Sequence, residues 1–593
     1  MAMLTSAATL IDRLALKPAE HRAVAARSPA MFLFLFTLWL AALVWFGPRL
    51  IKSMDAATGP VSIVAQAYFV VFVCIAWLYG LYNISVVTFA IYTKVRHRFE
   101  LADPVADEVI DVPVAVLYTT CNDFVEAGAT SCARMQYPNF KVYLLDDSSD
   151  PDYKRKVDRF ASRYDHVEVI RRDNRTGFKA GNLNHALKNV VTEPYFVVAD
   201  SDEIMPRDFL SRLTPRIVAD PQCGFIQANH QCIKHGTKLQ RDMCRGIDIH
   251  WAWYQPLRNK FGFVMFLGHG AILRRSCWDE AGGFPEIVSE DLAYAIAIRE
   301  RGYYGTFASD VVCMEEFPSS VRAFRVRHVK WTRGTCEFLH RFAPRLIGSR
   351  NISWTEKLDI LFPTANLPLT LFFFVFMIMT AIVLPMSIGE RAIITVETGM
   401  NSLRLPVVLM PEAMHVLYTW DFYLMTLVAL VSPLLCFVLA MWRTPLKLVR
   451  FLAHSTSLYA ALAPLSTICV VGYLRTRVAR FLVTGEAIHG ATDTAKQIDY
   501  WASTHPDSIV TQRLEWLAAW IFLLGALASV QIALFGLAIG YALLAIMHSA
   551  DWGRPGLQTL AWVPFSFIAM GIALGGFSLF GMQPVFFGFG FHF

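Results

Sequence analysis

Two acidic clusters in the middle of the chain directly follow apolar stretches that are typical of buried strands. Asp146-Asp147 comes after residues 142–145, and Asp200-Ser201-Asp202 comes after residues 195–199. Carboxylates spaced like those of Asp200 and Asp202 can hold a hard divalent cation through oxygen atoms while the metal binds a diphosphate. An isolated pair of this kind is more often a turn or a helix cap. Two such clusters at one edge of a single sheet favour a ligand site.

A glycine-containing segment lies between these clusters. Residues 176–184 read Thr-Gly-Phe-Lys-Ala-Gly-Asn-Leu-Asn, so Gly177 and Gly181 flank Lys179 near the start of a predicted helix. Glycine lets a ligand approach the backbone closely, a helix N-terminus favours phosphate, and lysine supplies a positive charge. The alternative is an ordinary loop that leads into a helix. The acidic neighbours favour the phosphate-binding interpretation.

A third acidic site, Ser289-Glu290-Asp291, precedes a predicted helix over residues 292–301. Asp291 could simply cap that helix. As a catalytic residue it would be a general base, which takes the proton from an attacking hydroxyl while a diphosphate leaves. The sequence leaves both roles open, and Glu290 and Asp291 are the candidate catalytic residues.

A basic amphipathic stretch over residues 320–347 contains the segment Arg327-His328-Val329-Lys330-Trp331. Stretches of this kind usually lie on an anionic membrane surface. The alternative is a binding role, in which Arg327 and Lys330 neutralise a leaving diphosphate and Trp331 stacks on a sugar ring.

The composition places these candidate residues between membrane segments. The chain has 593 residues, of which 55% are hydrophobic and 17% are charged, and its formal net charge is +6. These values exclude a soluble globular protein and a disordered chain. The basic residues stand beside apolar runs, which indicates orientation in a membrane rather than binding to nucleic acid. The 11 cysteines lack metal-ligand spacing and are expected to be free thiols in a reducing compartment.

The region from residue 103 to residue 317 alternates between short apolar stretches and amphipathic ones. The predicted strands are residues 112–119, 142–145, 167–170, 195–199 and 224–228. This alternation predicts an α/β domain with a mostly parallel sheet, covered by helices on both faces. In such domains ligands bind outside the carboxyl ends of the strands, where the acidic clusters lie.

About seven membrane spans are predicted around this domain. They are residues 31–46, 61–92, 369–386, 417–441, two spans within 514–547 with a turn near Gln531, and 557–580. Basic residues before the first span and after the second place both flanks, and so the domain, in the cytoplasm. Residues 451–474 could cross the membrane or lie flat on it, and the arginines that follow them favour an interfacial helix.

The predicted organisation therefore has seven parts. They are a cytoplasmic N-terminal segment (1–30), two transmembrane helices (31–95), the cytoplasmic α/β domain (103–317), interfacial helices (318–365), two transmembrane helices (366–442), an interfacial helix with a loop (443–510), and C-terminal transmembrane helices (511–593).

The order of the motifs resembles the processive family 2 membrane glycosyltransferases, which include cellulose, curdlan, chitin and hyaluronan synthases. The motifs are the aspartate pair, KAGNLN, DSD, SED and RxxKW, and the similarity covers residues 112–331 and the flanking spans. The resemblance implies a glycosyltransferase A-type, Rossmann-like domain inserted between transmembrane helices. It implies that Asp146 and Asp147 contact uracil and ribose, and that Lys179 lies near the nucleotide. Asp200 and Asp202 would bind the diphosphate through Mg²⁺ or Mn²⁺, and Asp291 would be the general base of an inverting transfer.

The resemblance also implies acceptor contacts and a gating loop. Residues 266–270, Phe-Leu-Gly-His-Gly, look like the segment that lines the acceptor site, so Gly268 and His269 are candidate acceptor contacts. Trp331 would stack on the acceptor sugar, and Arg327 and Lys330 would contact the donor. Residues 481–484, Phe-Leu-Val-Thr, resemble the start of the loop that closes over the nucleotide, which makes Thr484 a candidate donor contact.

Two motifs depart from the family pattern. The family's QxxRW motif has Arg327 in place of glutamine and Lys330 in place of arginine, and the gating loop has Glu486 and Ala487 where lysine and glycine are expected. Lysine cannot reproduce a bidentate guanidinium contact, so we expect phosphate contacts, linkage or chain length to differ from cellulose synthesis.

Together these features predict an inverting polysaccharide synthase in a bacterial inner (plasma) membrane. It is expected to transfer a hexose, glucose from UDP-glucose, to a growing β-glucan and to secrete the product through its own channel. The expected partners are the nucleotide sugar, a polysaccharide acceptor, the lipid bilayer and accessory or periplasmic export subunits, and nucleic acid is not among them. The alternatives are a non-processive transferase with a lipid acceptor and a synthase of a GlcNAc- or mannose-based polymer.

Two interpretations from other functional classes are disfavoured. A transporter with a regulatory nucleotide-binding domain predicts ionisable residues within the spans, and the predicted spans are nearly free of them apart from Asp421. A sensor built on a degenerate transferase should have lost acidic residues, whereas this sequence retains each one that the family pattern requires.

Overall fold

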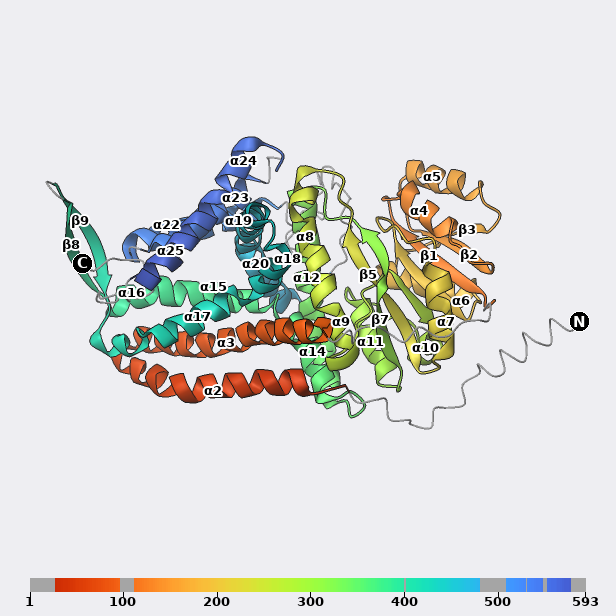
Figure 1. The fold of residues 1–593 in the computed structure, drawn as a ribbon. Helices are drawn as coiled ribbons and strands as arrows, with labels where there is room; N and C mark the ends of the chain where they lie inside the picture. The colour runs from red at the N-terminus through yellow and green to blue at the C-terminus, as the bar shows by residue number, and fades with distance from the viewer. Residues whose placement is uncertain are drawn as a thin grey trace, which may run out of the picture.

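An α/β domain and a bundle of long helices lie side by side along the molecule (Figure 1). The computed structural model describes residues 27–95, 111–398, 401–479, 508–529, 531–547 and 552–577. The sheet occupies one end of the molecule, and the long helices α2 (Ala30–Lys52) and α3 (Pro60–Val95) extend away from it. The predicted combination of an α/β domain with apolar helices on both sides of it in the sequence is confirmed.

The sheet has seven strands in the order β3-β2-β1-β4-β6-β5-β7. The strands are β1 (Val114–Thr120), β2 (Phe140–Asp146), β3 (Val167–Ile170), β4 (Tyr195–Asp200), β5 (Cys223–Cys232), β6 (Ala271–Arg274) and β7 (Tyr304–Glu315). All neighbouring pairs are parallel except those of β6, which runs antiparallel to β4 and to β5. The expectation of a mostly parallel sheet is correct for β1 to β4, but β6 and β7 were not predicted. β6 has only four residues, all buried, and so lacks an alternating pattern.

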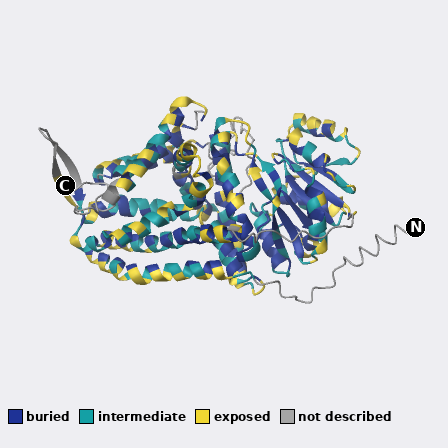
Figure 2. Cartoon of the chain, viewed as in Figure 1, coloured by how far each residue is buried: buried dark blue, intermediate teal, exposed yellow. Residues whose placement is uncertain are grey.

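Each central strand contributes to two hydrophobic cores, one on each face of the sheet. Ala115 and Leu117 of β1 pack into one core together with Leu183 of α6 (Phe178–Asn189). Val114 and Val116, which alternate with them, pack into the other core. Alternate strand residues point to opposite faces, so a strand that is apolar at consecutive positions must be covered on both. Figure 2 shows this concentration of buried residues in the sheet.

The other helices of this half cover the sheet or connect it to the bundle. They are α4 (Glu126–Ala133), α5 (Pro151–Ala161), α7 (Phe209–Ala219), α8 (Lys238–Trp253), α9 (Gln255–Phe261), α10 (Arg275–Ala281), α11 (Glu290–Arg299), α12 (Val321–Arg341), α13 (Ala343–Gly348) and α14 (Trp354–Ala365). Helices α8, α9, α12 and α14 lie between the sheet and the bundle (Figure 1).

Helix α12 is embedded in the protein, in contrast to the basic surface helix that its composition suggests. Its Arg325 forms an ion pair of 2.7 Å with Glu515 of α22 (Ile509–Ser529), and both side chains are almost fully buried. The ring of His328 bonds to the hydroxyl of Ser466 in α20 (Ala463–Thr476) at 2.5 Å. The basic residues of this helix therefore serve internal contacts as well as a polar surface.

Seven helical segments among the described residues are long and apolar enough to cross a membrane, by length and composition. They are Ala30–Ala56, Pro60–Lys94, Leu369–Ile388, Trp420–Met441, Pro445–Thr476, Ile509–Ser529 and Pro555–Ala573. The number agrees with the expected one, but the set differs. It includes residues 445–476, which were expected to lie flat, and it omits α23 (Ile532–Ile546), which is shorter. The side of the membrane on which each segment lies stays a prediction.

The outer faces of these helices are apolar. On α2, for example, Val44, Trp45 and Ile51 are 78%, 66% and 71% exposed. Figure 2 shows exposed and half-buried residues along the outer sides of α2 and α3. A contiguous exposed apolar surface of this kind is stable only when lipid or another protein covers it. The seven helical segments of membrane-spanning length and composition indicate that lipid is this cover, as in a membrane protein.

The remaining elements complete the bundle and its far end. They are α15 (Leu369–Ile378), a π-helical turn η2 (Met379–Val383), α16 (Leu384–Ile388), α17 (Trp420–Val431), α18 (Leu435–Met441), α19 (Pro445–Ala461), α24 (Pro555–Leu560) and α25 (Trp562–Phe577), with short turns η1 (Ser53–Ala56), η3 (Glu412–Leu417) and η4 (Ser432–Leu434). Strands β8 (Glu390–Thr398) and β9 (Asn401–Leu409) form an antiparallel hairpin at the end of the bundle that is remote from the sheet (Figure 1).

Candidate active site at the carboxyl ends of the strands

The two acidic clusters lie on either side of the end of β1. Asp146 ends β2 and pairs with Thr120, whereas Asp200 ends β4 and pairs with Thr119. Because β2, β1 and β4 are parallel neighbours, their carboxyl ends lie at one edge of the sheet. The structure thus brings together the two clusters that are more than 50 residues apart in the sequence.

Two arginines that were not among the predicted site residues occupy the first acidic cluster. Arg171 Nε donates to Asp146 Oδ2 at 2.8 Å, and the Arg172 guanidinium donates to both oxygens of Asp147 at 2.9 and 2.6 Å. The Asp146 side chain has no exposed surface, and the Asp147 side chain is only 8% exposed. Direct contact of these carboxylates with uracil and ribose stays a prediction. The arginines directly follow β3, so the same strand-end rule could have identified them.

Arg172 also fixes the segment that leads to Lys179. Its guanidinium donates to the carbonyl oxygens of Thr176 at 2.6 Å and Phe178 at 2.8 Å. Gly177 caps α6 with a left-handed backbone, φ = +74°. This conformation is strained for residues with a Cβ atom, which explains the glycine. The bidentate pair of Arg172 and Asp147 therefore sets the position of the first turn of α6.

Lys179 connects the second acidic cluster to the segment 266–270. Its ammonium group contacts Asp200 Oδ1 and donates to the carbonyl oxygen of Gly268 at 3.0 Å. Burial lowers the pKa of Lys179, but the attraction of Asp200, Glu290 and Asp291 outweighs burial, so that the net shift is upward. Lys179 is therefore a protonated cation among three carboxyl groups.

The second carboxyl group of the DSD motif has a different environment. Asp202 is an exposed residue. Desolvation of its carboxyl group by the surrounding protein and the negative charge of Asp200 nevertheless raise its pKa to about 7. Oxygen ligands of this type suit Mg²⁺ or Mn²⁺, and the Lys179 ammonium already shows that a cation is stable at Asp200. The residues present thus fit a divalent cation held by Asp200 and Asp202.

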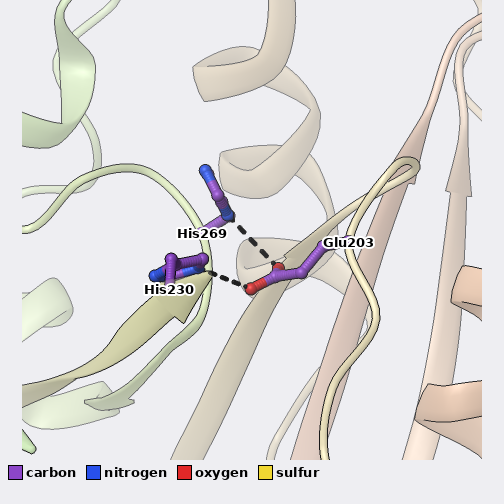
Figure 3. Close-up of side chains that lie close together, drawn as sticks. All are labelled: Glu203, His230 and His269. Atoms are coloured by element: carbon purple, nitrogen blue, oxygen red, sulfur yellow. Dashed lines mark hydrogen bonds and ion pairs between the residues drawn. The ribbon is translucent and has the colours of Figure 1, made fainter. Parts of the chain in front are cut away.

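A charged cluster begins at Glu203, which directly follows this motif in the sequence (Figure 3). Glu203 accepts from His230 at 2.9 Å and lies 3.4 Å from His269 Nδ1. Burial lowers the pKa of His269, but Glu203, Asp200 and Glu315 outweigh burial and raise it to about 10, so this ring is an imidazolium. Each of Glu203, His230 and His269 offers one potential metal-ligand atom within 4.8 Å of the others. Glu203 and His230 were not predicted, although both lie at or near strand ends.

Glu290 and Asp291 begin α11 opposite Lys179. Asp291 Oδ1 accepts from the backbone N–H of Leu292 at 2.7 Å, so the residue does shape the start of the helix. Burial and the neighbouring Asp291 raise the pKa of Glu290 to about 8, and burial raises the pKa of Asp291. The two carboxyl groups therefore share fewer than two negative charges at neutral pH.

Gly268 is the point at which these groups converge. A Cβ atom at this position would lie 3.3 Å from Asp291 Oδ2 and 3.8 Å from Lys179 Nζ. The position depends on β6, because the neighbouring Gly270 donates its N–H to Val198 in β4 and accepts from Ala228 in β5, both at 2.9 Å. The antiparallel strand β6 thus places the loop before it between the acidic sites.

We expect Gly268→Ala to lower both stability and donor affinity. Its φ of +88° costs a residue with a Cβ atom about 1–2 kcal/mol, and the methyl group would crowd Asp291. Thermal unfolding and calorimetric donor titration would measure the two effects. Gly282→Ala is the matched control, because its φ is +80° and nothing lies within 4 Å of the added Cβ. Equal losses of donor affinity in both variants would contradict the crowding argument.

The basic residues of α12 border the same space. The Lys330 ammonium interacts electrostatically with Asp200, Lys179 and Glu290, and the Arg327 guanidinium interacts with Glu315 and Asp202. Trp331 is 50% exposed, and the Arg327 guanidinium lies 4.7 Å from its ring centroid. Thr484, the remaining predicted donor contact, lies outside the described residues.

The comparison with family models identifies this domain. Residues 120–334 match the model described as "Glycosyltransferase like family 2". The central domain is a family 2 glycosyltransferase domain. The match extends from the end of β1 into α12 and so includes all the predicted site residues except Thr484. The prediction of a glycosyltransferase domain is thereby confirmed.

Curated relatives of this chain are named as plant glucomannan mannosyltransferases. The chain is 27% identical over 251 residues to glucomannan 4-beta-mannosyltransferase 7 of Arabidopsis thaliana, a match that covers 40% of this chain and 45% of the relative. It is 27% identical over 298 residues to probable glucomannan 4-beta-mannosyltransferase 4 of Oryza sativa subsp. japonica, covering 47% of this chain and 53% of the relative. The chain thus spans about half the length of the curated relatives it matches.

A solved structure is also similar to the chain. It is the mannosyltransferase PcManGT from Pyrobaculum calidifontis in complex with GDP-Man and Mn²⁺. The identity is 20% and the TM-score 0.35, and the match covers 53% of this chain and 84% of that one.

Proposed function

We propose that the protein is an inverting membrane polysaccharide synthase that transfers a hexose from a nucleotide sugar to a growing β-linked chain. The observation that carries the proposal is the convergence of Lys179, Asp200 and Asp291 around Gly268, at the sheet edge that α12 borders. A cation, a metal-binding carboxylate and a second carboxyl group at one point are the groups needed to hold a diphosphate and to activate a hydroxyl.

Each side chain has a role that follows from its position. Asp200 and Asp202 would hold Mg²⁺ or Mn²⁺, which when bound neutralises charge on the diphosphate. Lys179 and Lys330, which both interact electrostatically with Asp200, would contact the phosphates. Asp291 would take the proton from the acceptor hydroxyl, while Trp331 and the loop that contains Gly268 and His269 would position the acceptor sugar.

The names of the relatives inform the identity of the transferred sugar. Their names are those of glucomannan mannosyltransferases, which supports mannose as the transferred sugar alongside the predicted glucose. We propose a β-linked mannan or glucomannan as the product, with GDP-mannose as the first donor to test and UDP-glucose as the second. The apolar helices would carry the growing chain across a plasma membrane, in which accessory export subunits could join them.

A second candidate, a non-processive transferase with a lipid acceptor, is favoured by one contact. The Arg327 guanidinium packs over the ring of Trp331, at 4.7 Å, and also over Phe317 and Phe324. A cation on one face of the indole leaves less of the ring for a sugar. An enzyme that binds a single acceptor headgroup would need less stacking surface than a polymer synthase.

The test measures nucleotide release by the purified full-length protein in lipid nanodiscs. GDP-mannose, UDP-glucose, UDP-N-acetylglucosamine and UDP-glucuronate are supplied separately with Mg²⁺ or Mn²⁺. A polymer that β-mannanase digests would support the mannan assignment, whereas a polymer sensitive only to β-glucanase would restore the glucan assignment. An organic-soluble monoglycoside would support the lipid-acceptor alternative. Release that survives in Asp200→Asn would overturn the assignment of the site.

The dependence of turnover on pH gives a further prediction. A general base acts only when deprotonated, so activity should be lost as the pH falls and Asp291 becomes protonated. Because burial raises the pKa of Asp291, the midpoint of this loss should lie above the usual aspartate pKa of about 4. Because burial is the largest cause of that shift, the acidic limb should persist in Glu290→Gln. Profiles of kcat/KM between pH 4 and pH 9 would measure the limb. A limb that moves down to the ordinary aspartate value in Glu290→Gln would contradict this cause.

A further inference from the structure

Lys179 makes the contact at Asp200 that a divalent cation would have to make. Its ammonium group contacts Asp200 Oδ1, the same oxygen that accepts a hydrogen bond from the Thr119 hydroxyl at 3.0 Å. The carboxylate is therefore already neutralised by a group of the protein itself. A cation that approaches Asp200 must displace the ammonium or bind beside a like charge.

The surroundings hold Lys179 in this position. Only 12% of its side chain is exposed, and its ammonium group also donates to the Gly268 carbonyl oxygen. The segment before it is fixed by the Arg172 guanidinium, which donates to the carbonyl oxygens of Thr176 and Phe178. Lysine has a compact charge on a flexible stem, so the ammonium can move by rotation about its side-chain bonds while α6 stays in place.

Two other carboxyl groups lie close to the ammonium group. Glu290 and Asp291 both interact electrostatically with Lys179, and a Cβ at Gly268 would contact Asp291 and Lys179 together. If the ammonium group moves away from Asp200, Glu290 and Asp291 therefore still provide counter-charges for it. A diphosphate bound in this space would offer further negative oxygens to it.

We propose that Lys179 competes with the divalent cation for Asp200, so that the site binds the cation tightly only together with a nucleoside diphosphate. The Lys179 ammonium group would then donate to the phosphate oxygens, and Asp200 would become free to bind the cation. This inference rests on the proposed nucleotide-sugar site. It makes Lys179 a device that couples the binding of metal and donor, because each ligand removes an obstacle to the other.

Binding of Mn²⁺ to the full-length protein in nanodiscs tests the competition, with free Mn²⁺ measured by electron paramagnetic resonance. In the absence of nucleotide, Lys179→Gln and Lys179→Met should each bind Mn²⁺ about 10-fold more tightly than the unmodified protein, a factor in the usual range for coupled sites. Lys188→Gln is the matched control, because Lys188 is an exposed lysine at the other end of the same helix. It should bind Mn²⁺ like the unmodified protein.

Two further measurements sharpen the result. Adding Asp202→Asn to Lys179→Gln should abolish the gain, which separates this site from the cluster of Glu203, His230 and His269. With saturating GDP or UDP, the difference in Mn²⁺ affinity between Lys179→Gln and the unmodified protein should shrink. Unchanged or weaker Mn²⁺ binding in both Lys179 variants without nucleotide would overturn the proposal. Failure of all variants and of the unmodified protein to bind any nucleotide would instead contradict the proposed function. The Mn²⁺ comparison without nucleotide would still test the competition, because it requires no bound nucleotide.

Discussion

Replacing Asp291 by asparagine should lower turnover by about 10²- to 10⁴-fold, the usual contribution of a general base. The amide keeps the shape of the carboxyl group and can still accept from the backbone N–H of Leu292, which Asp291 Oδ1 now does at 2.7 Å. It cannot take a proton from an acceptor hydroxyl. Donor affinity should change little, so the loss should appear in kcat when nucleotide release is measured at saturating donor.

The matched control for this variant is Asp279→Asn. Asp279 is an acidic residue of α10 that lies 3.7 Å from Arg275, and its side chain is 55% exposed. Its replacement should leave turnover within a factor of about two, as expected for a surface position. If Asp291→Asn and Asp279→Asn had similar turnover, Asp291 would be a helix cap and not the base.

The second large effect is expected from the buried ion pair between the domain and the membrane helices. Glu515→Ala should destabilise the protein by about 3–5 kcal/mol, because it takes the carboxylate away from the deeply buried guanidinium of Arg325. Chemical denaturation of the full-length protein in nanodiscs, followed by tryptophan fluorescence, would measure the change. The same variant should also lower turnover, because α12 carries Lys330 and Trp331 next to the site.

A double variant and an exposed pair provide the controls. Arg325→Met combined with Glu515→Leu should recover most of the lost stability, since an apolar pair of similar volume avoids the cost of burying charges. Glu168→Gln, which breaks an exposed pair with Lys141, should cost less than about 1 kcal/mol. A double variant as unstable as Glu515→Ala would show that these residues stabilise the interface by packing and not by charge.

The positions of the candidate site residues in the fold could be predicted because they are defined by local sequence. An apolar stretch followed at once by aspartates marks the end of a strand, and parallel strands bring such ends to one edge. This reasoning correctly placed Asp146 and Asp200 beside each other, across the end of β1. It could also have identified Arg171 and Arg172, which follow β3 in the same way.

The contacts among these residues could not be predicted, because they depend on elements with weak local signals. The four-residue strand β6 runs antiparallel between β4 and β5, and its position brings Gly268 to Lys179 and Asp291. A strand so short and fully buried cannot be distinguished from a loop by periodicity. Likewise, nothing in the basic stretch of α12 distinguishes a helix on a lipid surface from one packed against α20 and α22.

The sequence by itself determined the class of the molecule, an α/β domain between apolar helices, and the side chains available for chemistry. These properties follow from composition, periodicity and strand-end residues, all of which act over short distances along the chain. Only the tertiary structure decided which charges neutralise one another: Arg171 and Arg172 at the aspartate pair, Lys179 at Asp200, and Arg325 at Glu515, 190 residues away. Such pairs depend on which surfaces meet when the chain packs, and packing between distant segments is not encoded in any local pattern.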